Sequence, residues 1–260
     1  MTKFQNYFAE QKRIFTEYHS NLLIKTTEED IHKLRTTLKR LKTFNILLDG
    51  LLFRQKDFPI ELTNLFKMSG EIRDIQIQQK ILEEYDDGYK AYLLYLYEDR
   101  LKKFKISKSY QAELDYLTEK MNKVDEYHID EQIIKNIQTY IELVYNDIRN
   151  MVENISPQNL HEIRIKLKRV YYTLLMLGEL QDVEKLNKIQ ETIGLWHDCD
   201  VTIENIRKFD NDLEIIKSLE TKRDSFYNES LELIKSIKYT KENYDIFSIV
   251  DEFCFKNGKK

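Results

Sequence analysis

Two short basic segments hold the side chains that are best suited to bind an anion. The first, residues 31–44, reads IHKLRTTLKRLKTF and carries five positive side chains, one histidine and no carboxylate. The second, residues 160–172, reads LHEIRIKLKRVYY. Arginine can donate two parallel hydrogen bonds to a phosphate group, and lysine supplies a compact positive charge. Rows of these side chains therefore predict a surface that binds an anion.

The two segments match each other in register. Four positions of the first recur 129 residues later with the same residue type: His32 and His161, Arg35 and Arg164, Lys39 and Lys168, Arg40 and Arg169. Lys42 extends the first set, whereas Tyr171 stands at the matching place in the second. A single basic helix is usually only a solvated face. Its duplication in register, with a histidine each time, favours a function.

The spacing of these residues places most of the cations on one side of a helix. At about 100° per residue, His32, Arg35, Lys39 and Lys42 fall within an arc of about 80°, beside an apolar arc that contains Leu34. The second segment repeats this pattern, with the cationic arc beside Ile163, Leu167 and Val170. Arg40 and Arg169 lie farther round their helices. One arc should pack into a core while the next presents its charges.

Charge is distributed unevenly along the chain. The whole protein has a formal charge of −4, yet residues 31–44 carry +5 and residues 161–172 carry +3, which leaves −12 for the rest. Like charges stacked on one helix face destabilise the helix by a few tenths of a kcal/mol per pair. A bound anion would recover that free energy.

The elements that must position these residues are predicted to be helices throughout. The chain has 6 glycines and 2 prolines in 260 residues, and its apolar residues recur at spacings of three and four. We expect helices at 4–24, 28–55, 59–83 and 88–125, the last with a break near Ser107. Capping signals at Thr26 with Glu29, and at Ser156 with Pro157, mark the starts of both basic helices.

A second pair of landmarks follows the basic segments in the same order. Residues 69–77, SGEIRDIQI, correspond to residues 193–201, IGLWHDCDV, and align Gly70 with Gly194 and Asp74 with Asp198. The aspartates are interpreted as structural partners of a helix end or of a basic side chain. The sequence thus predicts an all-α protein of two pseudo-symmetric four-helix bundles, residues 1–127 and 128–260.

Metal, membrane and secretory functions have little support. The run from His197 to Asp200 could suggest a metal site, but consecutive residues of a helix point in different directions. Two cysteines without CxxC spacing favour a reducing compartment, and neither a signal peptide nor a membrane span is evident. We expect a cytoplasmic protein with no metal, no cofactor and no membrane partner.

The ordered double set of H-x-x-R-x-x-x-K-R and G-x-x-[RH]-D motifs resembles the CHAD family, the conserved histidine α-helical domains. The resemblance spans essentially the whole chain, and it implies two bundles whose basic helices line a central groove or pore. It further implies that this groove binds inorganic polyphosphate without consuming it. Whether the protein associates with polyphosphate granules is left open. The acidic and basic strands of the CYTH domain, often fused to such domains, are not found here.

Carried over by position, the family's binding residues correspond to nine side chains: His32, Arg35, Lys39, Arg40, Lys42, His161, Arg164, Lys168 and Arg169. Tyr171 departs from the pattern, so the second half should bind less tightly. Charged imidazoles at His32 and His161 would strengthen binding as the pH falls toward about 6.

Several other functions remain open from the sequence. The same surface could bind an RNA backbone, other phosphate polyanions or an acidic protein docked on a helical scaffold. A phosphatase or a polyphosphate kinase would need clustered carboxylates or an activated nucleophile, and neither a P-loop nor an acidic triad is present. Catalytic residues are therefore not predicted, and the oligomeric state is left open.

Overall fold

A computed structural model of the chain describes most of its helical segments. The described residues are 3–24, 27–47, 63–85, 88–106, 112, 131–177, 183–209 and 212–239. Within them every regular element is an α-helix, which confirms the predicted all-α class. By its internal contacts the chain divides into two units, of which the first comprises residues 1–128 and 205–212 and the second residues 129–204 and 213–260.

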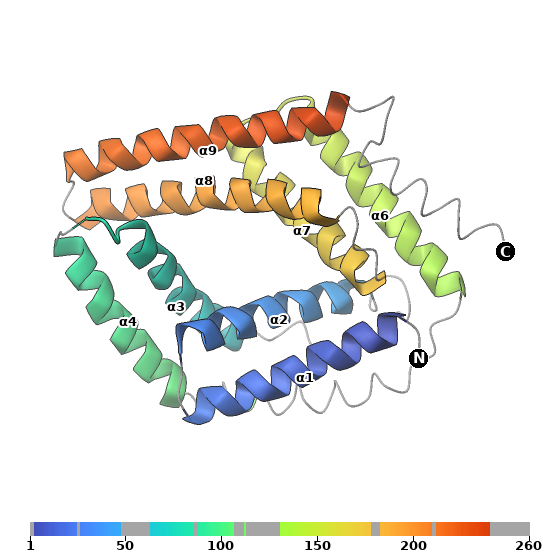
Figure 1. Ribbon diagram of the computed structural model, residues 1–260, viewed down its shortest axis with the longest axis horizontal. Coiled ribbons are helices and arrows are strands. Elements are labelled where there is room, and N and C mark those ends of the chain that lie inside the picture. The colour runs from blue at the N-terminus through green and yellow to red at the C-terminus, as the bar shows by residue number, and fades with distance from the viewer. Residues whose placement is uncertain are drawn as a thin grey trace. The chain divides into compact units, whose positions relative to one another are not determined.

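The described part of the first unit contains four consecutive helices and the end of a later one. The four are α1 (Lys3–Ile24), α2 (Glu28–Leu47), α3 (Thr63–Ile81) and α4 (Gly88–Ile106) (Figure 1). Each packs against the next along the chain, α1 on α2, α2 on α3 and α3 on α4. The basic helix α2 therefore has a neighbour on each side, α1 and α3.

The last turn of a later helix completes this unit. Residues 205–209, the end of α8 (Val183–Phe209), group with the first unit. There the Asn205 side chain donates to Gln78 Oε1 (3.2 Å). The centroid of the Phe209 ring lies 5.2 Å from that of Tyr89 and 4.9 Å from that of Tyr92. The first unit thus depends on a segment that follows most of the second in sequence.

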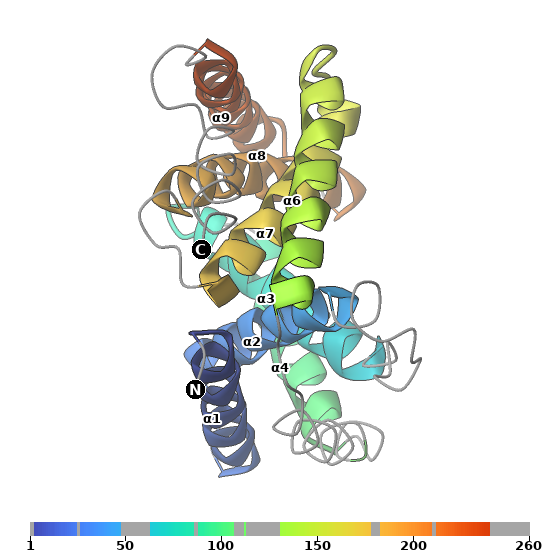
Figure 2. The same ribbon diagram turned by 90° about the vertical axis from the view of Figure 1, so that its right-hand side faces the viewer.

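The second unit repeats the order of elements around the other basic helix. It contains α6 (Glu131–Val152), α7 (Pro157–Leu177), most of α8 and α9 (Leu213–Tyr239). Helix α6 packs alongside α7 (Figure 2). Helix α8 is joined to α7 through Arg164, which donates to the Gln190 carbonyl, and to α9 through an ion pair of Asp200 with Arg223.

The apolar faces of both basic helices are buried as predicted. On α2, Ile31, Leu34, Leu38 and Leu41 are at most 1% exposed. On α7, Ile163, Leu167 and Val170 have the same degree of burial. Burying a Leu, Ile or Val side chain contributes roughly 1.5–3 kcal/mol. This face therefore fixes how each helix is rotated about its axis, and with it the direction of the neighbouring cations.

The start of α2 corrects one detail of the sequence interpretation. The capping pair is Thr27 with Asp30, one residue later than the predicted pair of Thr26 with Glu29. The Asp30 N–H donates to Thr27 Oγ1 (3.2 Å), and the Thr27 N–H donates to the Asp30 carboxylate (2.7 Å). The segment TTEED offers two threonines and three acids, so spacing alone could not select the register. At α7 the prediction is confirmed, because the helix begins at Pro157.

The predicted ends of the helices in the first unit are only partly tested. Helix α1 agrees with the expected range to within one residue, and α2 begins where it was expected. Helix α3 ends at Ile81, two residues early, and is followed by a turn. The expected ends at residues 55 and 125 and the break near Ser107 lie outside the described residues.

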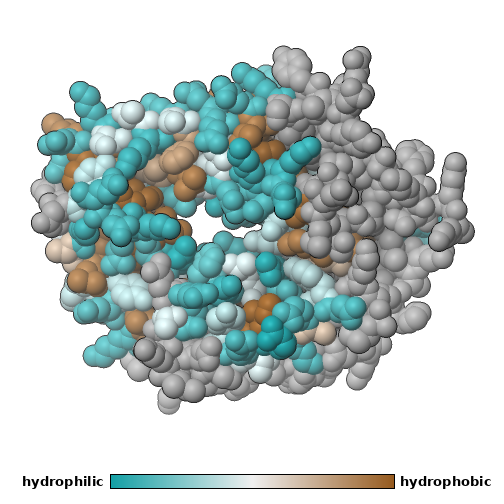
Figure 3. Space-filling view, viewed as in Figure 1, coloured by the Kyte–Doolittle hydropathy of each residue, from teal (hydrophilic) through white to brown (hydrophobic). Residues whose placement is uncertain are grey.

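The described surface is mainly hydrophilic on the face shown in Figure 3, with hydrophobic residues in scattered patches. No helix among the described residues is long and apolar enough to cross a membrane. The division at residues 127 and 128 into two pseudo-symmetric bundles, and the groove or pore between them, stay predictions.

Candidate anion-binding site

The cationic arc of α2 holds both exposed and half-buried side chains. His32 and Lys42 are exposed, whereas Arg35, Lys39 and Arg40 are half-buried. On α7, His161, Arg164, Lys168 and Arg169 are all half-buried. Every predicted binding residue thus keeps some contact with solvent.

Arg35 is held against the neighbouring helix α3. Its Nη1 donates to the Phe66 carbonyl (2.7 Å), and its guanidinium carbon lies 4.7 Å from the centre of the Phe66 ring. Lys42 Nζ lies 5.6 Å from the same ring. A cation within about 6 Å of an aromatic face is attracted by the electrons of the ring. Phe66, which the sequence did not single out, therefore orients two of the predicted cations.

Gly70 provides the space that the Arg35 guanidinium occupies. A Cβ atom added to Gly70 would lie 2.6 Å from Arg35 Nη1, closer than real Cβ contacts allow. Sequence comparison of the two halves had matched this glycine to Gly194 but gave it no role.

The second unit has the same arrangement on α7 and α8. Arg164 Nε donates to the Gln190 carbonyl (3.1 Å), and a Cβ atom on Gly194 would lie 2.6 Å from Arg164 Nη2. In both units the arginine of the basic motif thus occupies the space beside the glycine of the second motif. This contact gives a physical reason why the two motifs occur together in each half.

An aspartate partly offsets the burial of each arginine. Burial lowers the pKa of Arg35 and of Arg164, while the nearby charges of Asp74 and Asp198 act in the opposite direction. An arginine remains charged at any physiological pH. Each unit therefore keeps one fixed positive charge beside a carboxylate, which agrees with the structural role expected for the two aspartates.

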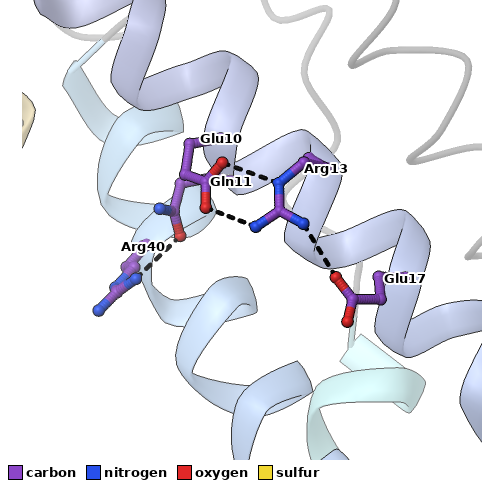
Figure 4. Close-up of polar contacts among 5 residues, drawn as sticks. All are labelled: Glu10, Gln11, Arg13, Glu17 and Arg40. Carbon is purple, nitrogen blue, oxygen red and sulfur yellow. Dashed lines mark hydrogen bonds and ion pairs between the residues drawn. The ribbon is translucent and has the colours of Figure 1, made fainter.

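Arg40 is directed toward α1. Its Nη1 donates to Gln11 Oε1 (3.1 Å), while Arg13 on the same helix bridges Glu10 and Glu17 (Figure 4). This agrees with the position of Arg40 outside the main cationic arc. Its contact with Gln11 indicates that Arg40 contributes to the packing of α1 on α2.

Two other lysines of the basic helices are paired with acids. The Lys33 Nζ atom lies 3.9 Å from Glu29 Oε1. The Lys166 Nζ atom lies 2.9 Å from Asp147 Oδ2 of α6 and 3.7 Å from Glu162 Oε1. Neither lysine belongs to the predicted binding set. These pairs account for positive charges that the sequence had counted as part of the two segments.

His161 lies against a second histidine that the sequence analysis did not include in the site. The His161 and His197 ring centroids are 4.3 Å apart. His161 Nδ1 is buried and has no hydrogen-bond partner among the described residues. The alignment of SGEIRD with IGLWHD was the signal that could have identified His197, because it places this histidine at the position of Arg73.

Metal-binding and nucleophilic groups are not concentrated in the described part of the chain. No group of three His, Cys, Asp or Glu side chains there could hold a metal ion. Burial raises the pKa of the Cys199 thiol to about 11. Cys199 is therefore a protonated core residue at neutral pH, while Cys254 lies outside the described residues.

Replacing Gly70 with alanine should displace the Arg35 guanidinium. The lost charge-assisted hydrogen bond costs about 1.5–3 kcal/mol, and the better helix propensity of alanine returns about 1 kcal/mol. We expect Gly70→Ala to lower the free energy of unfolding by about 1 kcal/mol in a denaturant titration.

The same substitution in an Arg35→Ala background reverses the sign. With the guanidinium absent, alanine at position 70 meets no obstacle and should stabilise the protein by about 1 kcal/mol. Gly194→Ala with Arg164→Ala provides the matched cycle in the second unit. Equal effects of Gly70→Ala in both backgrounds would show that Gly70 does not serve to accommodate Arg35.

Comparison with known proteins assigns the chain to a family. The model of the CHAD domain matches residues 11–207, more than half of the chain. The crystal structure of the CHAD domain from the plant Ricinus communis superposes with a TM-score of 0.63 at 14% sequence identity, over 95% of this chain and 89% of the plant chain. No match was found among curated proteins. Sequence and fold together place this chain in the CHAD family.

Proposed function

We propose that the protein binds inorganic polyphosphate without consuming it, through the cationic faces of α2 and α7. The observation that carries the proposal is the duplicated arrangement: each unit sets a histidine, an arginine and a lysine beside a buried apolar face and fixes the arginine against a glycine of the next helix. Membership of the CHAD family supports the same ligand.

Polyphosphate suits such a surface because it offers charge without bases. A protein that reads nucleic acid sequence needs donors and acceptors directed at base edges, whereas phosphate contacts need only cations at suitable spacing. The residues proposed to contact the polymer are the predicted set on both helices. Within it, Arg35 and Arg164 also hold the neighbouring helices, so they act as fixed charges rather than as mobile ones.

The proposed role is binding rather than catalysis. Phosphoryl transfer requires groups that hold metal ions or activate a nucleophile. Among the described residues, two acids beside the basic helices are engaged with lysines: Asp147 with Lys166, and Glu29 with Lys33. Incubation with polyphosphate and Mg²⁺ should therefore release no phosphate.

Competition between polymers tests the choice of ligand. We expect polyphosphate to displace a fluorescent single-stranded RNA at a concentration at least tenfold lower, counted in phosphates, than unlabelled RNA requires. A poly-glutamate competitor tests the docking of an acidic protein by the same readout. If RNA or poly-glutamate competes as well as polyphosphate, the surface is a general polyanion site and the proposal fails.

The ligand also implies a place in the cell. A protein that binds polyphosphate is proposed to act in the cytoplasm, where it would associate with polyphosphate granules. Other phosphate polyanions would compete for the same cations.

A further inference from the structure

The second unit contains two neighbouring histidines where the first unit has a histidine and an arginine. His161 on α7 and His197 on α8 have ring centroids 4.3 Å apart and planes inclined by 41°. In the aligned motif of the first unit, Arg73 stands at the position of His197. An arginine carries its charge at every physiological pH, whereas a histidine gains its charge only near or below about pH 6.5.

The surroundings of His161 favour its neutral form in the free protein. Arg164 and Lys168 on α7 and His197 on α8 all act against a positive imidazole, while Asp198, among the described residues, acts in favour of one. Burial, the largest cause, and the three positive groups lower the pKa of His161, and Asp198 opposes them only in part. On the α6 side, Asp147 is bound to Lys166.

The buried nitrogen of His161 is a second, independent observation. Nδ1 has no hydrogen-bond partner among the described residues. An unsatisfied buried polar atom destabilises the free protein and would gain from a partner. Because Nδ1 itself is buried, a bound anion would act through the accessible part of the ring: its negative charge offsets Arg164 and Lys168 and favours a protonated imidazole.

We propose that His161 and His197 form a proton-coupled phosphate subsite, present in the second unit and replaced by a permanent charge at Arg73 in the first. This inference rests on the proposed binding of polyphosphate and specifies how that binding is regulated. When a phosphate group arrives, the histidine pair takes up a proton from solvent. No bond of the polymer is broken.

The sign of the pH effect follows from this linkage. The free protein has a histidine pKa below the ordinary value of about 6.5, and the bound polyanion raises it. Affinity should therefore be constant at high pH, rise as the pH falls through the pKa of the complex, and level off below the pKa of the free protein. If binding raises the pKa of the histidine by about 1, the affinity at low pH rises about tenfold.

Calorimetric titration of the full chain with polyphosphate at pH 8 and pH 6 tests the proposal. The polymer should be long, because terminal phosphates themselves titrate near neutral pH and must contribute little. Titrations in two buffers of different ionisation enthalpy give the number of protons taken up. We expect about tenfold tighter binding at pH 6 and net proton uptake by the wild type.

Two exchanges between the units serve as matched variants. His197→Arg gives the second unit the residue of the first and should bind tightly at both pH values with less proton uptake. Arg73→His makes the reverse exchange and should weaken binding at pH 8 while steepening the pH dependence. Thermal unfolding of each variant confirms that it is folded, and NMR titration of the His161 ring with and without polyphosphate reports its pKa directly.

The outcomes separate this inference from the function on which it rests. Tight binding at pH 8 that is unchanged at pH 6, or a proton uptake that is the same in His197→Arg as in the wild type, would overturn the proton-coupled subsite and leave polyphosphate binding in place. A His161 pKa that polyphosphate does not raise would overturn it as well. An absence of binding at both pH values would overturn the proposed function and the subsite together.

Discussion

Raising the salt concentration from about 50 to 200 mM should weaken polyphosphate binding by about three orders of magnitude. A flexible polyanion releases condensed counterions when it binds to cations, and the logarithm of affinity falls with the logarithm of salt by about 0.7 per phosphate contact for single-stranded polymers. About eight contacts, close to the number of predicted binding residues, give a slope near −5 to −6. The effect is large because it is the sum over the whole cationic row.

Fluorescence anisotropy with an end-labelled polyphosphate at four or more salt concentrations measures this slope. The number of contacts that it reports should fall by about one for each binding cation that is removed. An affinity that hardly changes with salt would show that binding does not depend on the row of charges.

Removing Lys39 and Lys168 together should reduce affinity by about 10²- to 10⁴-fold. These lysines occupy matching positions on α2 and α7, and both are half-buried beside the arginines held by the neighbouring helices. A charge-assisted hydrogen bond contributes about 1.5–3 kcal/mol, so two of them account for this range. The variant Lys39→Ala/Lys168→Ala leaves Arg35 and Arg164 in place and so preserves the contacts between helices.

The matched control removes two lysines from the same helices. Lys33→Ala/Lys166→Ala changes the net charge equally but affects lysines that lie outside the predicted binding set and pair with Glu29, Asp147 and Glu162. The exposed pair of Lys33 with Glu29 contributes about 0–1 kcal/mol, whereas the Lys166 side chain is only 17% exposed. Thermal unfolding of this control is therefore measured beside its binding. We expect this control to bind within about threefold of the wild type at moderate salt. If both variants lose affinity equally, net charge alone determines binding.

The sequence was a good guide to the helices because their periodicity is strong. The burial of Leu34 and Leu38 on α2 and of Leu167 on α7 follows directly from their spacing. The register of the Thr27 cap did not follow, because adjacent threonines and acids satisfy the same rule and tertiary packing selects among them. Regular patterns thus predict which face is buried more reliably than where a helix begins.

The candidate site was predictable in composition but not in contacts. Matching the two halves identified the cations, since the same residue types recur in register. The seating of Arg35 over Phe66 and beside Gly70 depends on a helix more than 30 positions away, and no local pattern reveals it. The approach of His197 to His161 likewise depends on how α8 packs on α7.

Residues 205–212 belong to the first unit but are translated long after the rest of it, which affects how the protein folds during synthesis. The first unit includes this segment, whose Phe209 ring stacks on Tyr92. During synthesis on the ribosome, α1 to α4 emerge long before their last partner is translated. The amino-terminal half must therefore wait for nearly the whole polypeptide before it is complete, and a gene truncated at the midpoint would encode an unfinished domain.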